Sequence, residues 1–205
     1  MTIDPVYLVL ESSDWVARML ACGIKLIQLR IKSAAEAELR REIAVSRDLC
    51  ARRGAQFVVN DHWRLAIDLG CAHVHLGQDD LDSADLGALR AAGVRVGVST
   101  ETQEELERAL ALGADSVALQ PIFPTASKRF ERPPQGLDRL RLWKERLRGK
   151  PLIAIGGVRL DDAEAVFAAG ADCVALISDV TRAADPEQRA RAWLAATRHY
   201  VRVEA

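Results

Sequence analysis

Two segments of the chain, ALGADSVAL at residues 111–119 and AAGADCVAL at residues 168–176, share an order of glycine, short polar link and apolar run. Upstream of Gly113, the apolar residues Leu106 and Leu110 recur at helical spacing. A glycine ends a helix well because it takes a positive φ without a Cβ clash. Each segment therefore predicts a helix, a glycine cap, a short loop and a buried strand.

The same unit recurs along the chain. The further copies are ACGIKLIQL (21–29), ARRGAQFVV (51–59), DLGCAHVHL (68–76), AAGVRVGV (91–98) and LRGKPLIAI (147–155). With VYLVL at residues 6–10 they give eight short, mostly apolar strands, which is typical of a parallel sheet covered by helices. Crossovers from strand to helix to parallel strand are right-handed, so eight such strands alternating with helices most simply close into a ring. The sequence therefore predicts an α/β fold, a (β/α)8 TIM barrel that forms a single domain over residues 1–205. An open doubly wound sheet is the alternative, and residues 124–136 form the one segment long enough for a substantial loop.

Composition narrows the class of protein. The 205 residues are 49% hydrophobic, and 29 acidic side chains nearly balance 28 Lys and Arg, so the global basic field that non-specific nucleic-acid binding needs is missing. The four cysteines show no C-x-x-C spacing, which favours reduced, packed thiols. The N-terminus lacks a basic leader pattern, and no apolar run approaches the length of a membrane span. We expect a cytoplasmic protein with small-molecule partners, without nucleic acid or membrane; a homo-oligomer is left open.

In a barrel of this kind, chemistry occurs just after the carboxyl ends of the strands. The second strand leaves as QLRIK, in which Gln28, Arg30 and Lys32 alternate with apolar residues and are expected to share one face. Two cations at one strand exit indicate an anionic substrate group, because guanidinium and ammonium groups bind phosphate oxygens. The alternative is an ordinary solvated strand end.

Carboxylates follow the next two strands. VVND ends in Asp61 and HLGQDD ends in Asp79 and Asp80, and neighbouring parallel strands lie about 4.8 Å apart. Oxygen ligands at adjacent exits favour Mg²⁺, which commonly takes one or two protein carboxylates. The alternative for each aspartate is a helix cap or turn cap.

The remaining exits are also polar. They supply Ser99 and Thr100, the PIFPTASK segment with Lys128, the pair Gly156 and Gly157, and Ile177 with Ser178. Loops after the seventh and eighth strands often bind phosphate through backbone N–H groups, and Ser99 and Thr100 could instead cap the following helix. His73 and His75 alternate as in a zinc site, but no third nitrogen or sulfur ligand is placed near them, so His75 is expected to pack and hydrogen-bond inside the barrel.

The polar residues at the strand exits thus predict two anion-binding regions with a metal site between them. They include no nucleophile paired with a base. This combination favours departure of a phosphate or diphosphate, assisted by metal and charge, over hydrolysis through a covalent intermediate.

The motifs QLRIK, VND, HLGQDDL, GVST, PIFPTASK, PQGL and AIGGV, in this order from Tyr7 to Ser178, together resemble the thiamine phosphate synthase family. The resemblance implies a (β/α)8 barrel enzyme, an alkyl transferase of thiamine biosynthesis. It joins 4-amino-2-methyl-5-(diphosphooxymethyl)pyrimidine to a thiazole phosphate, in its carboxylated or tautomeric form, and releases pyrophosphate with Mg²⁺. Diphosphate leaves first in this family, and the thiazole nitrogen then attacks the resulting pyrimidinylmethyl cation.

Carried over by motif, the resemblance assigns residues to three roles. Asp61 and Asp80 are the implied Mg²⁺ ligands. Arg30, Lys32, Ser99 and Lys128 are the implied catalytic residues, acting on the diphosphate. The implied substrate-binding set is Gln28, Leu29, Arg30, Ile31, Lys32, Asn60, Ser99, Thr125, Ala126, Ser127, Lys128, Gly156, Ile177 and Ser178.

Several positions depart from the family pattern. Gln120 and His73 replace common glycines, Ser127 replaces a common threonine, and Asp179 adds a negative charge next to Ser178. Two alternatives remain: a thiazole tautomerase-like enzyme, against which the intact GQDD argues, and a non-catalytic sensor of thiazole phosphate.

Overall fold

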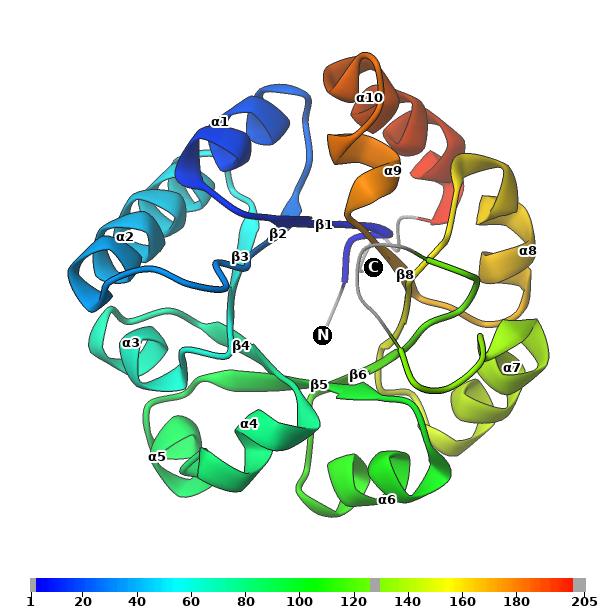
Figure 1. Cartoon of the computed structure of the whole chain (residues 1–205), viewed down its shortest axis with the longest axis horizontal. Coiled ribbons are helices and arrows are strands. Elements are labelled where there is room, and N and C mark those ends of the chain that lie inside the picture. The colour runs from blue at the N-terminus through cyan, green and yellow to red at the C-terminus, as the bar shows by residue number, and fades with distance from the viewer. Residues whose placement is uncertain (1–2, 126–129, 201–205) are drawn as a thin grey trace.

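The computed structural model describes residues 3–125 and 130–200, and its eight strands form one closed parallel barrel in sequence order, as predicted (Figure 1). The strands are β1 (Val6–Leu10), β2 (Leu26–Leu29), β3 (Gln56–Asn60), β4 (His73–Leu76), β5 (Arg95–Thr100), β6 (Ser116–Leu119), β7 (Leu152–Ile155) and β8 (Cys173–Leu176). β1 pairs with both β2 and β8, which closes the ring and excludes the open sheet.

Helices surround the barrel on its outer side (Figure 1). They are α1 (Ser13–Ala21), α2 (Glu36–Arg52), α3 (Trp63–Asp68), α4 (Gln78–Ser83), α5 (Leu86–Ala91), α6 (Gln103–Ala111), α7 (Gly136–Arg146), α8 (Ala163–Ala168), α9 (Ser178–Thr181) and α10 (Pro186–Thr197), with short 3₁₀ turns at Leu160–Asp162 and Arg198–Tyr200. The described residues between β6 and α7 form no helix or strand, in agreement with the predicted long loop.

The glycines of the repeated units end helices as predicted. Gly113 follows α6 with φ +76°, and Gly170 follows α8 with φ +102°. The N–H group of Gly113 donates to the carbonyl of Leu110 at 3.0 Å. The left-handed conformation turns the chain from each helix into the next strand.

Strand alternation divides the core into two layers. Tyr7 and Val9 of β1 and Ala118 of β6 belong to the cluster inside the barrel. Their neighbours, including Leu8 and Leu119, pack outward against the helices in the larger cluster. The polar side chains at the barrel mouth therefore continue the inward-facing rows of the strands.

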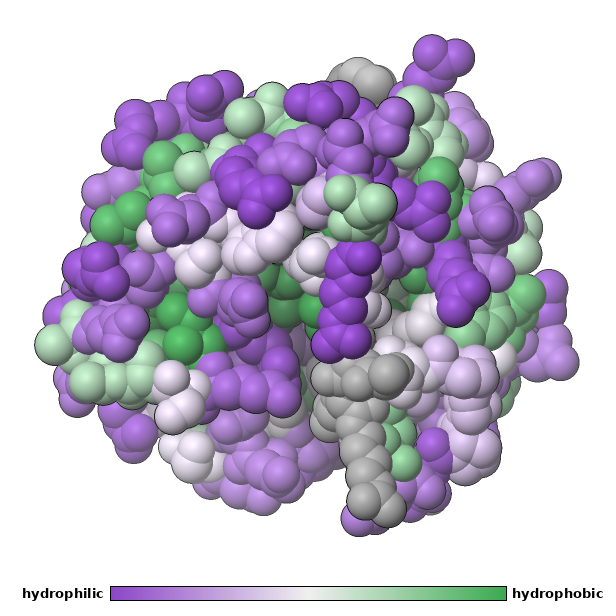
Figure 2. Space-filling view, turned by 45° about the horizontal axis from the view of Figure 1, so that its top comes forward, coloured by the Kyte–Doolittle hydropathy of each residue, from purple (hydrophilic) through white to green (hydrophobic). Residues whose placement is uncertain are grey.

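The surface in Figure 2 is mainly hydrophilic, and hydrophobic residues form small separate groups on it. Among the described residues, the exposed large hydrophobic side chains are Val45 and Leu142. No helix in the described part of the chain has the length and apolar character needed to cross a membrane.

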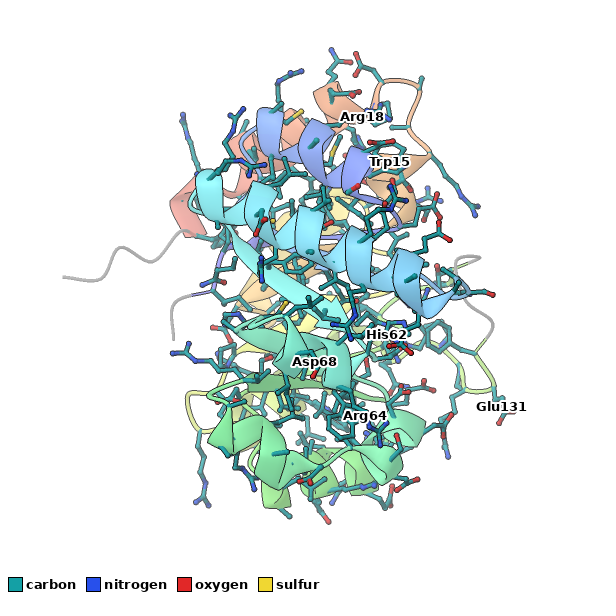
Figure 3. The ribbon with its side chains drawn as sticks, turned by 90° about the vertical axis from the view of Figure 1, so that its left-hand side faces the viewer. Trp15, Arg18, His62, Arg64, Asp68 and Glu131 are labelled. Carbon is teal, nitrogen blue, oxygen red and sulfur yellow. The ribbon has the colours of Figure 1, made fainter. Side chains whose placement is uncertain are left out.

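Figure 3 shows the barrel from the side, with α1, α2 and α3 toward the viewer. His62 lies at the mouth end of α3, and Asp68 lies at its opposite end. Glu131, which precedes α7 in the chain, projects beyond the mouth. The mouth is therefore formed by the loops after the strands.

Candidate active site

A cavity of about 1350 Å³ opens at the carboxyl ends of the strands. The residues of the predicted site that line it are Gln28, Arg30, Asn60, Asp61, Asp80, Ser99, Thr125, Gly156, Ile177 and Ser178. They come from the exits of β2 to β8, so segments far apart in the sequence meet in one wall. Their individual roles stay predictions.

The structure places the residues of QLRIK in different surroundings, and their binding roles stay predictions. Leu29 and Ile31 pack in the outer hydrophobic cluster, and the side chain of Lys32 is exposed and does not line the cavity. β2 ends at Leu29, so strand alternation does not continue to Lys32. Arg30 keeps its place because its N–H group donates to the carbonyl of Leu10 at 2.7 Å. The predicted residues Ala126, Ser127 and Lys128 lie outside the described residues.

Asp61 and Asp80 form a carboxylate pair at the exits of β3 and β4. Burial and the neighbouring Asp80 carboxylate raise the pKa of Asp61 to about 6, against the opposing effect of Arg30 and the Asn60 amide. The Asn60 amide donates to the Asp61 carboxylate. The backbone N–H of Asp61 donates to the carbonyl of His75 at 2.9 Å, which ties the β3 exit to β4.

This pair fits the residues that Mg²⁺ takes in phosphate-binding enzymes. Two half-buried carboxylates lie side by side and repel each other, and a divalent cation between them would relieve this repulsion. Within residues 3–125 and 130–200, no group of three or more His, Cys, Asp or Glu side chains could hold a metal. Asp61 and Asp80 would therefore hold the ion together with water and substrate oxygens.

The alternative role as a helix cap or turn cap is met by one of the three aspartates, Asp61, Asp79 and Asp80. α3 begins at Trp63, and Asp61, with φ +62°, provides no side-chain cap for it. The Asp80 carboxylate does accept the N–H of Gly77 at 3.3 Å at the start of α4, so it caps that helix and also faces Asp61. Asp79 is exposed in the same wall, without a hydrogen bond to any described residue.

His75 lies inside the barrel, where its Nε2 is 2.8 Å from the hydroxyl oxygen of Ser99. This confirms the expected packing and hydrogen bonding of His75. Burial lowers the pKa of His75 to about 4, which keeps the imidazole neutral. Gly97 makes room for the ring, because a Cβ there would lie 2.8 Å from His75 Nδ1.

The neighbouring Thr100 faces away from the cavity. Its hydroxyl donates to the carbonyl of Ala118 at 3.1 Å and accepts the Trp143 indole N–H at 3.0 Å. Thr102, whose hydroxyl accepts the N–H of Glu105, caps α6 instead. Of the two hydroxyls at the β5 exit, Ser99 is the one that lines the cavity.

Gly156 and Gly157 have positive φ angles of +96° and +72°. A Cβ on Gly156 would lie 2.8 Å from Pro121 Cβ, and one on Gly157 would lie 2.5 Å from the carbonyl oxygen of Pro124. The N–H of Phe123 donates to the carbonyl of Gly156 at 2.9 Å. The glycine pair therefore receives the loop after β6, a role that the sequence did not reveal.

Asp179 does not present an unbalanced charge to the cavity. Arg189 donates to both of its carboxylate oxygens, at 3.0 and 2.9 Å, and the indole N–H of Trp193 donates at 2.7 Å. The negative charge that Asp179 adds next to Ser178 is thus neutralised by side chains of α10.

A family model described as Thiamine monophosphate synthase matches residues 6–180. The chain belongs to this family. A protein from Rhizobium etli named thiamine-phosphate synthase is 50% identical over 197 residues, covering 96% of this chain and 97% of that protein. One of the same name from Neisseria meningitidis serogroup B is 45% identical over 201 residues, covering 95% and 98%. The solved thiamine phosphate pyrophosphorylase from Pyrococcus furiosus has a TM-score of 0.84 at 27% identity, with 96% of each chain covered.

The chain is thus an enzyme of the thiamine monophosphate synthase family, and its cavity has polar residues that sequence reasoning missed. Tyr7 lies in the inner wall, where its hydroxyl accepts a hydrogen bond from the Gln28 amide at 2.8 Å. Arg182, Arg159 and Arg189 line the side nearest Ser178. The alternation of β1 could have indicated Tyr7, whereas nothing in the local sequence marks the three arginines.

Proposed function

We propose that this member of the thiamine monophosphate synthase family joins a hydroxymethylpyrimidine diphosphate to a thiazole phosphate, releasing pyrophosphate and forming thiamine phosphate. One observation carries the proposal: a single cavity holds the Asp61–Asp80 pair beside Arg30 at one end and Ser178 beside the β7 exit at the other. That arrangement suits two phosphorylated substrates bound in one cavity. The family membership and the relatives' names support the same reaction.

We infer that the chain promotes departure of the diphosphate by stabilising its charge. Mg²⁺ held by Asp61 and Asp80, when bound, would offset negative charge on the diphosphate oxygens. Arg30 supplies a fixed positive charge at the same end of the cavity, and the Ser99 hydroxyl supplies a hydrogen bond. The C–O bond breaks with its electron pair on the diphosphate.

The acceptor needs no general base. The thiazole nitrogen attacks with its own lone pair, so the new C–N bond forms without removal of a proton. In this proposal Gln28, held by Tyr7, orients the pyrimidine, and the inner wall keeps water from the cation. Backbone groups near Gly156, Ile177 and Ser178 hold the acceptor phosphate. A carboxylated acceptor also loses its carboxylate as CO2, and the carbon left behind takes a proton from water.

The test is a product assay with both substrates and Mg²⁺. We expect thiamine phosphate and pyrophosphate in equal amounts, and we expect a chelator to abolish product. A folded protein that gives neither product at high enzyme concentration would overturn the proposal. Consumption of the thiazole phosphate alone would indicate a tautomerase, and binding without turnover would indicate a sensor. We further propose that the enzyme works in the cytoplasm.

A further inference from the structure

His75 has no role in the proposed chemistry, yet it is the histidine in contact with a cavity hydroxyl. It is 8% exposed, and its Nε2 lies 2.8 Å from Ser99 Oγ. Ser99 is on β5 and His75 on β4, so the contact joins neighbouring strands inside the barrel. Ser99 and His75 both belong to the residues that line the cavity.

The backbone around the pair is arranged for this contact. His75 and Gly97 are register partners, and any side chain on Gly97 would displace the imidazole, whose Nδ1 lies 2.8 Å from the position of a Cβ. Gln78 of α4 fixes the strand end by donating from its amide to the carbonyl of Ser99 at 2.7 Å. Both the backbone and the side chain of Ser99 are therefore held from β4 and α4.

The direction of the His75–Ser99 hydrogen bond decides what Ser99 can offer a substrate. If the imidazole accepts, the Ser99 hydrogen is occupied by His75. If Nε2–H donates, Ser99 Oγ is the acceptor and its own hydrogen is free to point into the cavity. A neutral imidazole carries one N–H group, so the tautomer selects between these two arrangements.

We propose that His75 is a positioning residue whose Nε2–H donates to Ser99 Oγ and so directs the Ser99 hydroxyl hydrogen toward an anionic substrate oxygen. The proposal rests on the proposed function for the identity of that oxygen, which belongs to the departing diphosphate. His75 does not touch substrate in this scheme and acts through Ser99 alone.

A double-mutant cycle tests the coupling. We expect Ser99→Ala and His75→Phe each to lower kcat/KM by about tenfold to 100-fold, the range for a hydrogen bond to a charged group. The double variant should lose little beyond Ser99→Ala, since His75 acts through that hydroxyl. His75→Gln retains an N–H donor and should recover most of the loss. Losses that multiply in the double variant, or no rescue by Gln, would overturn the proposal.

His73 provides a matched control on the same strand and the same face. Its ring nitrogens are buried, and His73 is not among the residues that line the cavity. We expect His73→Phe to keep wild-type kinetics, so a general effect of replacing a buried β4 histidine is separated from the effect of losing the Ser99 contact. A loss equal to that of His75→Phe would count against the proposal.

The tautomer can be read in the free enzyme by ¹⁵N NMR of the histidine ring. We expect His75 to carry its hydrogen on Nε2, and we expect its ¹⁵N shifts to change in Ser99→Ala. An Nδ1–H tautomer would refute the inference, whether or not the enzyme forms thiamine phosphate. Failure of the wild-type product assay alone would instead refute the proposed function.

Discussion

The contact between Gly157 and the loop after β6 gives a prediction that a matched glycine can isolate. Gly157 and Gly93 have nearly equal φ angles, +72° and +71°. A Cβ on Gly93 would meet no atom within 4 Å, whereas a Cβ on Gly157 would lie 2.5 to 2.7 Å from backbone atoms of Phe123 and Pro124. The two alanine variants therefore share the strain of positive φ and differ in the overlap.

The magnitudes follow from these two effects. Alanine in the left-handed region costs about 1–2 kcal/mol at either position. At Gly157 the loop must also retreat by roughly 1 Å to reach an ordinary contact, and such overpacking costs about 1–3 kcal/mol more. We expect Gly93→Ala to lose about 1–2 kcal/mol of unfolding free energy and Gly157→Ala about 2–5 kcal/mol.

Equilibrium unfolding in urea, followed by steady-state kinetics of both variants, checks this prediction. Because the displaced loop leads into Thr125 of the cavity wall, Gly157→Ala should also raise KM for the thiazole phosphate, while Gly93→Ala should not. Equal losses of stability with equal KM values would show that the glycine pair does not receive the loop as described.

Three further predictions concern the cavity. Asp61→Asn or Asp80→Asn should lower kcat by about 100-fold or more at saturating Mg²⁺, while Asp79→Asn should change it little; a crippled Asp79→Asn enzyme would place the metal differently. Burial lowers the pKa of His75 from 6.5 to about 4, so between pH 4 and pH 6.5 the His75 side chain binds a proton in the unfolded chain but not in the folded chain. The associated stability is complete above pH 6.5 and is lost as the pH falls toward 4. From pH 7 to 5, wild type should thus lose up to about 2 kcal/mol more than His75→Gln in urea unfolding, and equal losses would contradict this. Gln120→Gly should keep or raise turnover with the thiazole phosphate, and a large loss would reveal a role for the Gln120 amide.

The fold could be predicted from local signals because each unit carries its own helix stop and strand pattern. Gly113 and Gly170 take the positive φ that the repeated segments indicate, and inward alternation places Gln28 and Arg30 at the mouth. The same alternation gives no direction for the Lys32 side chain, because β2 ends at Leu29. Periodicity predicts side-chain direction only while the strand continues.

Contacts between elements could not be predicted in this way. Arg189 follows Asp179 by ten residues on a different helix, and no local pattern indicates that the two side chains meet. The loop that occupies the Cβ space of Gly156 and Gly157 belongs to another unit of the barrel, so a glycine pair that suggested ligand approach also serves chain packing. Such partners are defined by the closed barrel and become visible only in three dimensions.

The aspartates of the cavity differ in how far neighbouring side chains balance their negative charge, and this difference supports the prediction that Asp61 and Asp80 bind Mg²⁺. Asp179 is balanced by two hydrogen bonds from Arg189 and one from the Trp193 indole. For Asp61 and Asp80 the described structure offers the more distant Arg30 charge and the Asn60 amide, and the pKa of Asp61 stays raised to about 6. The protein thus neutralises the acid beside the proposed acceptor phosphate region and leaves a carboxylate pair undercompensated beside the proposed diphosphate region. An undercompensated pair of oxygen ligands favours binding of a divalent cation there, and the same imbalance would repel a diphosphate that arrived without one.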